Sequence, residues 1–188
     1  NAFASCTSLN NVILPDTMYY KISEYTFYGC TSLTQIDLPS GISLIENRAF
    51  ALCPIESITI PAGVSTIESY AFQQCPLDEI FFEGNAPSIE SNSIPNTYGI
   101  TVYYISGNTG FSWRLNSRYN LFTKIERYAV SFDLGDNLNR TGGGELYQVL
   151  DNGGSATLPI FEIDEGWDFL GWDNSYVNIS ENKNIGAI

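Results

Sequence analysis

Residues 49–82 read AFALCPIESITIPAGVSTIESYAFQQCPLDEIFF, and they contain the end of one structural unit and the beginning of the next. The pair Ala49-Phe50 returns 22 residues later as Ala71-Phe72. A cysteine follows each Phe by three residues, at Cys53 and Cys75. A period of this length is typical of solenoids, in which each repeat forms one coil and buries its apolar face against the next coil.

The same pattern occurs four times in the first half of the chain. With spacings of 24, 23 and 22 residues, the Phe position is occupied by Phe3, Phe27, Phe50 and Phe72. Each repeat continues with an apolar alternation such as Leu33-x-x-Ile36-x-Leu38, and most then have a proline and a second motif such as Ile42-x-x-Ile45. The alternation predicts a short strand with its apolar residues on one face, and the proline ends that strand.

A fifth, degenerate unit keeps the register. Adding 22 to Ile67, Ile80 and Phe82 gives Ile89, Val102 and Tyr104, whereas the cysteine position of this unit holds Thr97. We expect a short amphipathic helix in residues 111–119 and a last strand in residues 121–125, because the open end of a solenoid needs atypical structure to cover it. The first predicted domain is therefore residues 1–126, a solenoid with a C-terminal cap.

The four cysteines occupy one position in successive repeats. They are Cys6, Cys30, Cys53 and Cys75. A small, weakly polar side chain suits a buried column inside the coils, so the spacing favours buried free thiols. A disulfide between stacked neighbours is the alternative.

The repeat Ala-Phe-x-x-Cys-x-Ser-Leu-x-x-Ile-x-Leu-Pro-x-x-Ile-x-x-Ile resembles the BspA-type leucine-rich repeat of bacterial surface and secreted proteins. The likeness covers about residues 1–105 and is closest at residues 30–39, CTSLTQIDLP. The family often has Gly after the second-strand Ile, where this chain has Glu46, Glu68 and Glu90. The resemblance implies an extracellular or cell-surface protein, with further repeats, signal and anchor expected outside this sequence.

From about Arg127 the period is lost and a different module begins. A strand-like Val-x-Phe-Asp at residues 130–133 and the motif Gly-Trp-x-Phe-x-Gly-Trp at residues 166–172 resemble the Listeria–Bacteroides repeat. The second predicted domain is residues 127–188, which the resemblance makes a small β-grasp-like module. We expect Trp167 and Trp172 to be core residues of this module, and a sugar-stacking platform is the alternative. The predicted fold class is mostly β: a leucine-rich-repeat solenoid of short strands with short helical turns, plus this small β-rich module.

Side chains that alternate outward from the predicted strands would line the concave face of the solenoid. Solenoids commonly bind along such a surface, and here it is polar and acidic with aromatic residues at one end. The candidate ligand-binding residues are Asp37, Glu56, Asp78, Glu79, Phe81 and Tyr103. An ordinary solvated face is the alternative interpretation of these residues.

Glu46, Glu68 and Glu90 recur at 22-residue intervals and should stack. Like charges in a column repel unless water or a cation intervenes. A calcium-binding column is one interpretation, and a solvated acidic edge that protects the strands from pairing is the one we favour. The four residues Asp133, Asp136, Asn137 and Asn139 lack the spacing of a calcium loop and are expected to be turn residues.

The composition of the chain argues against several classes of function. The net charge of −13 makes nucleic acid an improbable partner, because phosphate contacts need clustered Lys and Arg. No apolar run is long enough to insert in a membrane. The chain has no histidine, which removes the commonest general base and metal ligand, so we expect no enzyme activity, no cofactor and no metal.

The sequence therefore predicts a non-catalytic binding module of a bacterial secreted or cell-surface protein. Its partner would be a host or microbial protein or glycan, bound through the concave face of the solenoid. The alternative is a structural stalk that presents another domain and has no ligand of its own.

Overall fold

The computed structural model describes residues 1–15, 20–95, 99–111 and 123–188. These residues form strands, turns and loops, with no helix among them. They divide into two compact units, the first comprising residues 1–104 and 108–125 and the second residues 105–107 and 126–188. Thr97, residues 112–119 of the predicted helix and residues 121–122 of the predicted last strand fall outside the described residues, as do 16–19. Phe111, the first residue of the predicted helix, lies in a turn.

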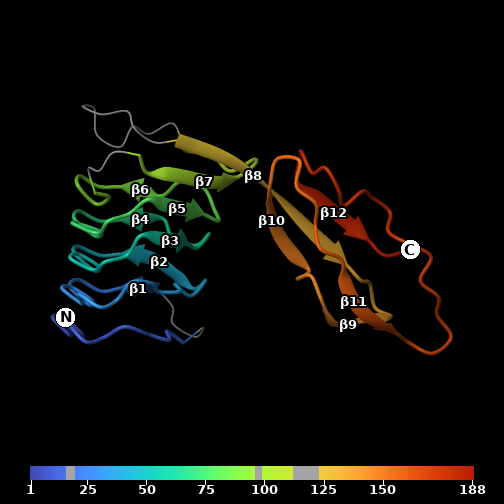
Figure 1. Cartoon of the computed structure of the whole chain (residues 1–188), viewed down its shortest axis with the longest axis horizontal. Coiled ribbons are helices and arrows are strands. Elements are labelled where there is room, and N and C mark those ends of the chain that lie inside the picture. The colour runs from blue at the N-terminus through green and yellow to red at the C-terminus, as the bar shows by residue number, and fades with distance from the viewer. Residues whose placement is uncertain (16–19, 96–98, 112–122) are drawn as a thin grey trace. The chain divides into compact units, whose positions relative to one another are not determined.

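The first unit is a stack of coils, and four short strands lie along one side of it (Figure 1). They are β1 (Tyr20–Ile22), β2 (Ile42–Ile45), β4 (Thr66–Ile67) and β6 (Ser88–Ile89). All neighbours in this sheet are parallel, and Ile45, Ile67 and Ile89 face one another in register. The second apolar motif of each repeat therefore forms the second strand of its coil, as the spacing predicts.

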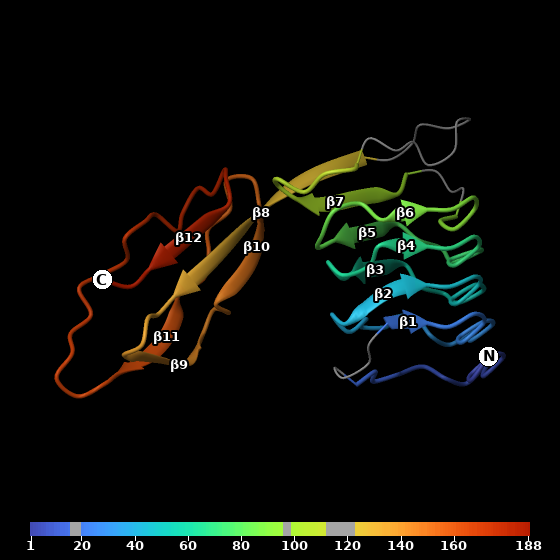
Figure 2. The ribbon, with the colours of Figure 1, turned by 180° about the vertical axis from the view of Figure 1, so that it is seen from behind.

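A second set of parallel strands forms the other side of the coils, visible from behind in Figure 2. It comprises β3 (Ser57–Ile60), β5 (Glu79–Phe82) and β7 (Thr101–Ile105). Ile58 pairs with Ile80, and Ile80 pairs with Val102. The 22-residue register predicted for the degenerate fifth unit is thus confirmed.

The predicted first strand is wrong for the first two coils. Residues 10–14 and 34–38 are not strands, although their side chains still alternate, with Ile36 buried and Asp37 exposed. An apolar alternation decides which side chains are buried, whereas a strand also needs backbone hydrogen bonds to a neighbour. These two segments make none to the described residues.

The helical turns expected in the coils are also absent, and the corners are hydrogen-bonded turns instead. Ala49 N donates to Glu46 O at 3.2 Å, and Cys53 N donates to Phe50 O at 3.1 Å. Two residues in the corners of the second, third and fourth coils have left-handed backbone, such as Arg48 (φ 51°) and Leu52 (φ 66°) in the third. A left-handed residue reverses the helical sense, so the turn cannot continue into a right-handed helix.

Stacked rings and thiols fill the interior of the coils. The ring centroids of Phe27 and Phe50 lie 5.4 Å apart, and those of Phe50 and Phe72 lie 5.3 Å apart, with the planes nearly parallel. Cys53 Sγ donates to Phe27 O at 3.0 Å, and Cys75 Sγ to Phe50 O at 3.1 Å. Each thiol therefore bonds to the coil before its own.

The cysteines are free, as predicted. Cys30, Cys53 and Cys75 are buried, whereas Cys6 in the first coil is exposed, which corrects its predicted place in the interior. Burial raises the pKa of the Cys53 and Cys75 thiols to about 12, because a thiolate loses its hydration in the apolar interior.

The second unit is built around β8 (Thr123–Asp133), which also contains the boundary between the units. β10 (Tyr147–Asp151) pairs with it antiparallel and β12 (Lys183–Gly186) pairs with it parallel. A separate antiparallel ribbon joins β9 (Leu138–Gly143) to β11 (Pro159–Ile163). Asp133, at the end of β8, and Asn139, in β9, therefore belong to strands and not to the turns expected for them.

An aromatic group packs in the second unit. Phe132 lies 5.1 Å from Trp172 between ring centroids, and Phe161 and Phe169 complete the group. Trp172 is thus half-buried among aromatic rings, as predicted. Trp167 is 59% exposed, so its predicted place in the core is wrong.

Candidate functional site

The outward side chains of β5 and β7 form the centre of the candidate site. Glu79 is paired with Thr101 and Phe81 with Tyr103, so these residues lie in two rows across neighbouring strands. The Tyr103 hydroxyl donates to Glu79 Oε1 at 3.1 Å. We call the outward residues of β3, β5 and β7, together with Glu56, Asp78 and Asp37, the strand face.

Glu56 and Asp78 stack at the position just before β3 and β5. Asp78 N donates to Glu56 O at 2.8 Å, and both side chains are exposed. In the next coil the same position, 22 residues on, is the buried Ile100. The acidic column therefore ends at Asp78, one strand before the strand that carries Tyr103.

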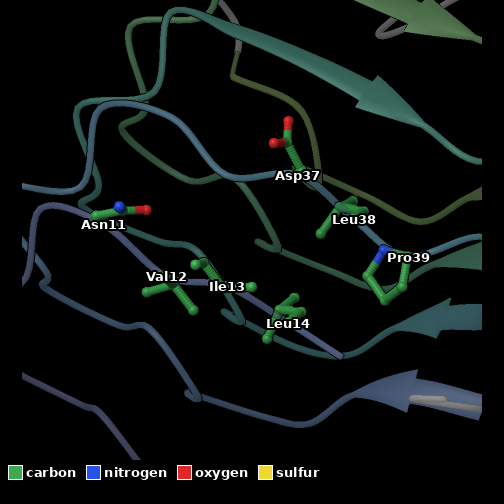
Figure 3. A pocket seen from close by; sticks show the side chains of 7 residues that line it. All are labelled: Asn11, Val12, Ile13, Leu14, Asp37, Leu38 and Pro39. Carbon is green, nitrogen blue, oxygen red and sulfur yellow. The ribbon is translucent and has the colours of Figure 1, made fainter. Parts of the chain in front are cut away.

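Asp37 lies apart from the other candidates, on the second coil. It lines a hollow of about 270 Å³ between residues 11–14 and residues 37–39, and Figure 3 shows these two segments side by side. Ile13, in the same hollow, is 89% exposed. The hollow thus combines a carboxylate with unusually accessible apolar surface.

The strand face carries uncompensated negative charge. Its four carboxylates are Asp37, Glu56, Asp78 and Glu79, and none of them makes an ion pair with the described residues. The two cationic side chains that the structure describes in the coils are engaged elsewhere. Lys21 on β1 bonds to Glu46, and the Arg48 guanidinium lies over the ring of Tyr70 at 4.5 Å.

The column of Glu46, Glu68 and Glu90 has a role that the sequence did not reveal. Glu68 Oε2 accepts a hydrogen bond from Asn47 N at 2.9 Å, and Glu90 Oε2 accepts one from Ser69 N at 3.0 Å. Each carboxylate thus satisfies a corner N–H of the coil before it, and the partial positive charge of that N–H offsets part of the repulsion within the column. Its exact 22-residue interval was the only signal in the sequence.

Glu46 makes a further contact at the same place. Its Oε1 lies 2.6 Å from Lys21 Nζ, and its Oε2 accepts from Glu24 N at 2.9 Å. The hydrogen bond from Lys21 lowers the pKa of the Glu46 carboxyl, and Glu46 in turn raises the pKa of Lys21. We favoured a solvated acidic edge from the sequence, and at Glu46 that interpretation leaves out the ion pair with Lys21 and the backbone hydrogen bond from Glu24.

In the ranges that the structure describes, no three Cys, Asp or Glu side chains gather as a metal ion would require. Within the same ranges no helix has the length and hydropathy to cross a bilayer.

These features define a parallel β-solenoid whose coils are joined by repeated Phe, Cys and Glu contacts. Comparison with known families matches the BspA-type leucine-rich repeat region in six copies over residues 1–113, and the chain belongs to this family. Such repeats are typical of bacterial surface proteins, generally bind proteins and are typically non-catalytic. The Listeria–Bacteroides resemblance of the remaining residues stays a prediction.

Comparison with curated proteins and comparison with solved structures each give no significant match to this chain.

Proposed function

We propose that this chain is a non-catalytic adhesion module of a secreted or surface-attached bacterial protein, and that its strand face binds a protein or glycan outside the cell. Membership of the BspA-type family supports the class of function. One observation supports the site: Phe81 and Tyr103 lie side by side in register, both only partly buried, beside the exposed Glu79.

Aromatic rings next to hydrogen-bonding groups suit recognition of either ligand class. Partly buried aromatics supply most of the binding energy at many protein interfaces, and their faces also stack on sugar rings. The Tyr103 hydroxyl and the Glu79 carboxylate already orient each other, which lowers the entropy lost when a ligand binds them. The surrounding carboxylates would select against anionic ligands.

The experiment is binding of the chain to an array of extracellular-matrix proteins, mucins and glycans. A variant with Phe81→Ser, Tyr103→Ser and Glu79→Gln is compared with the original chain. The matched control carries Tyr20→Ser and Glu24→Gln, which remove an exposed aromatic and an exposed acid at β1. Circular dichroism confirms that both variants keep their strands.

A specific hit that is lost in the strand-face variant and kept in the control supports the proposal. A hit that survives in both variants rejects the strand face as the site. No hit on the array rejects adhesion by this chain and leaves the stalk as the function.

A further inference from the structure

One edge of the ribbon in the second unit is open. β11 bonds only to β9 among the described strands. Leu158 O accepts from Gly144 N and Asp164 N donates to Asn137 O, both at 3.0 Å, so these even-numbered residues direct their backbone toward β9. Alternate residues of an antiparallel strand point to opposite edges, so Phe161 and Ile163 direct their N–H and C=O groups to the open edge.

Exposed apolar side chains lie on both faces of this open strand. Ile160 is 62% exposed and Ile163 is 44% exposed. Because they are three residues apart, the alternation of a strand places them on opposite faces. A flat partner could cover only one of them, whereas a strand added at the edge would contact both.

The acidic residues in and after β11 indicate the charge that a partner should carry. The stretch from residue 141 to 182 has eight acidic residues and no Lys or Arg. Glu162 lies in β11, and Asp164, Glu165 and Asp168 follow the strand directly. Glu145 and Asp151 are already ion-paired, and Glu181 lies before β12. A second copy of the chain would bring this charge against itself, so charge complementarity favours a cationic partner.

The opposite edge of the ribbon lacks these properties. β9 has Gly142 and Gly143 at its end and carries Arg140. The Arg140 guanidinium bonds to Gly144 O at 2.9 Å and to Glu145 Oε1 at 2.6 Å, so it is already paired. An exposed strand edge with apolar neighbours is a template for a further strand, and β11 is the one that offers it.

We propose that the open edge of β11 binds an extended, Lys- or Arg-bearing segment of a partner protein by strand addition. The backbone of the segment pairs with Phe161 and Ile163, its basic side chains lie along Glu162, and its apolar side chains cover Ile163 on the other face. This site is separate from the strand face and does not depend on the function proposed for it.

The probe is a fluorescent seven-residue peptide that alternates Val and Lys, which places Val on one face and Lys on the other. Binding to the full chain is measured by fluorescence anisotropy. Two control peptides replace Lys by Glu, or carry N-methyl groups on the residues whose N–H would face β11. We expect the first control to lose binding through charge and the second through the missing donors.

Protein variants test the same site. Ile163→Pro removes a donor from the open edge, where proline is tolerated, and we expect it to weaken binding by about tenfold or more. Glu162→Gln removes one charge, and Glu181→Gln removes the same charge in the loop before β12. We expect weaker binding for the first and unchanged binding for the second. Circular dichroism checks that each variant is folded.

Hydrogen exchange locates the peptide. Bound peptide should slow exchange at the amides of Phe161 and Ile163, and leave Ile160 and Glu162 unchanged because these already face β9. Equal binding of the N-methylated peptide, equal loss in Glu181→Gln, or no protection at Phe161 would overturn the proposal. Concentration-dependent dimerisation abolished by Ile163→Pro would also overturn it, by making a second copy the occupant.

Discussion

The carboxylate of Glu68 accepts a hydrogen bond of 2.9 Å from the backbone N–H of Asn47, 21 residues earlier in the chain. Asn47 begins the corner of the preceding coil, where a turn leaves backbone donors without partners. The bond therefore links two coils at a corner, outside both sheets. Glu46 and Glu90 make the equivalent bond, which explains why a column of like charges is tolerated.

Replacing Glu68 by Ala should destabilise the solenoid by about 1 kcal/mol, the usual cost of losing a side chain that caps a backbone N–H. The measurement is urea unfolding followed by circular dichroism. Glu56→Ala is the control, because Glu56 is exposed and its side chain makes no bond to the described residues. Its effect should stay within about 0.5 kcal/mol. Equal losses in both variants would show that the Glu68 bond contributes nothing.

Phe50→Ala should be far more destabilising, by about 3–5 kcal/mol, because it empties a fully buried site between two stacked rings. Phe3 stacks on one ring only, 5.5 Å from Phe27, and is 42% exposed. Phe3→Ala should therefore cost about 1 kcal/mol. Denaturant titration of both variants gives the comparison, and a cost at Phe3 equal to that at Phe50 would contradict it.

Gln74→Gly should stabilise the chain, because Gln74 is exposed and has left-handed backbone (φ 60°). Relief of that conformation is worth about 1–2 kcal/mol, and the added freedom of Gly in the unfolded chain offsets about 0.5–1 kcal/mol of it. The neighbouring Gln73→Gly lacks the relief and should destabilise. Melting temperatures should therefore shift in opposite directions, and a decrease in both would contradict the assignment of strain to Gln74.

Thiol labelling should distinguish the cysteines. In the native chain an aromatic disulfide reagent at pH 8 should modify the exposed Cys6 rapidly and leave Cys53 and Cys75 unmodified until the chain unfolds. The thiolate is the reacting form, and burial raises the pKa of these two thiols to about 12. The variant Cys6→Ser should remove the fast phase. A fast phase that persists would mean that the interior opens readily.

The same pKa values determine how stability responds to alkali. A thiol whose pKa is raised by folding holds its proton longer in the folded chain, so its contribution is complete below the unfolded pKa near 8.5 and is lost as pH rises toward about 12. The free energy of unfolding should fall above about pH 9. Replacing Cys53 by Ala should make that decline shallower, as urea titrations at several pH values would show.

The free energy of unfolding should also fall in acid, because Glu46 becomes protonated there. Lys21 lowers the pKa of Glu46, so the contribution of that carboxylate is complete above its unfolded pKa and is lost as pH falls through the lowered folded pKa. Glu46→Gln should reduce the dependence of melting temperature on pH below about pH 4.5. An unchanged acid dependence would mean that other carboxylates govern it.

The repeat was predictable from sequence because its physical cause is periodic. A residue such as Ile67 meets the residue one coil further on, Ile89, wherever the coils have equal length, so the spacing gives the register directly. The rows of the strand face follow in the same way, which is why Phe81 and Tyr103 are brought together. Asp37 has the same repeat position but lies two coils before Phe81, so it is separated from them along the stack.

Features that depend on backbone conformation or on atoms of a neighbouring coil were not predictable. The left-handed corners are occupied by Arg48 and Leu52 in place of glycine, so composition does not reveal them. The bond from Asn47 to Glu68 needs the corner geometry to be known first. Tryptophan is a large apolar residue, which favours a place in the core, but no repeat indicates where Trp167 lies. In the structure its side chain is exposed.

The contacts between coils determine which changes in chain length the solenoid can accept. Phe50 stacks on a ring in each adjacent coil, and Cys75 and Glu68 bond to the coil before theirs. Loss or duplication of one whole coil, of 22 to 24 residues, recreates chemically equivalent joints, whereas loss or insertion of half a coil places the Phe, Cys and Glu columns out of register together. Genes for such chains are therefore free to lengthen and shorten by recombination in whole coils.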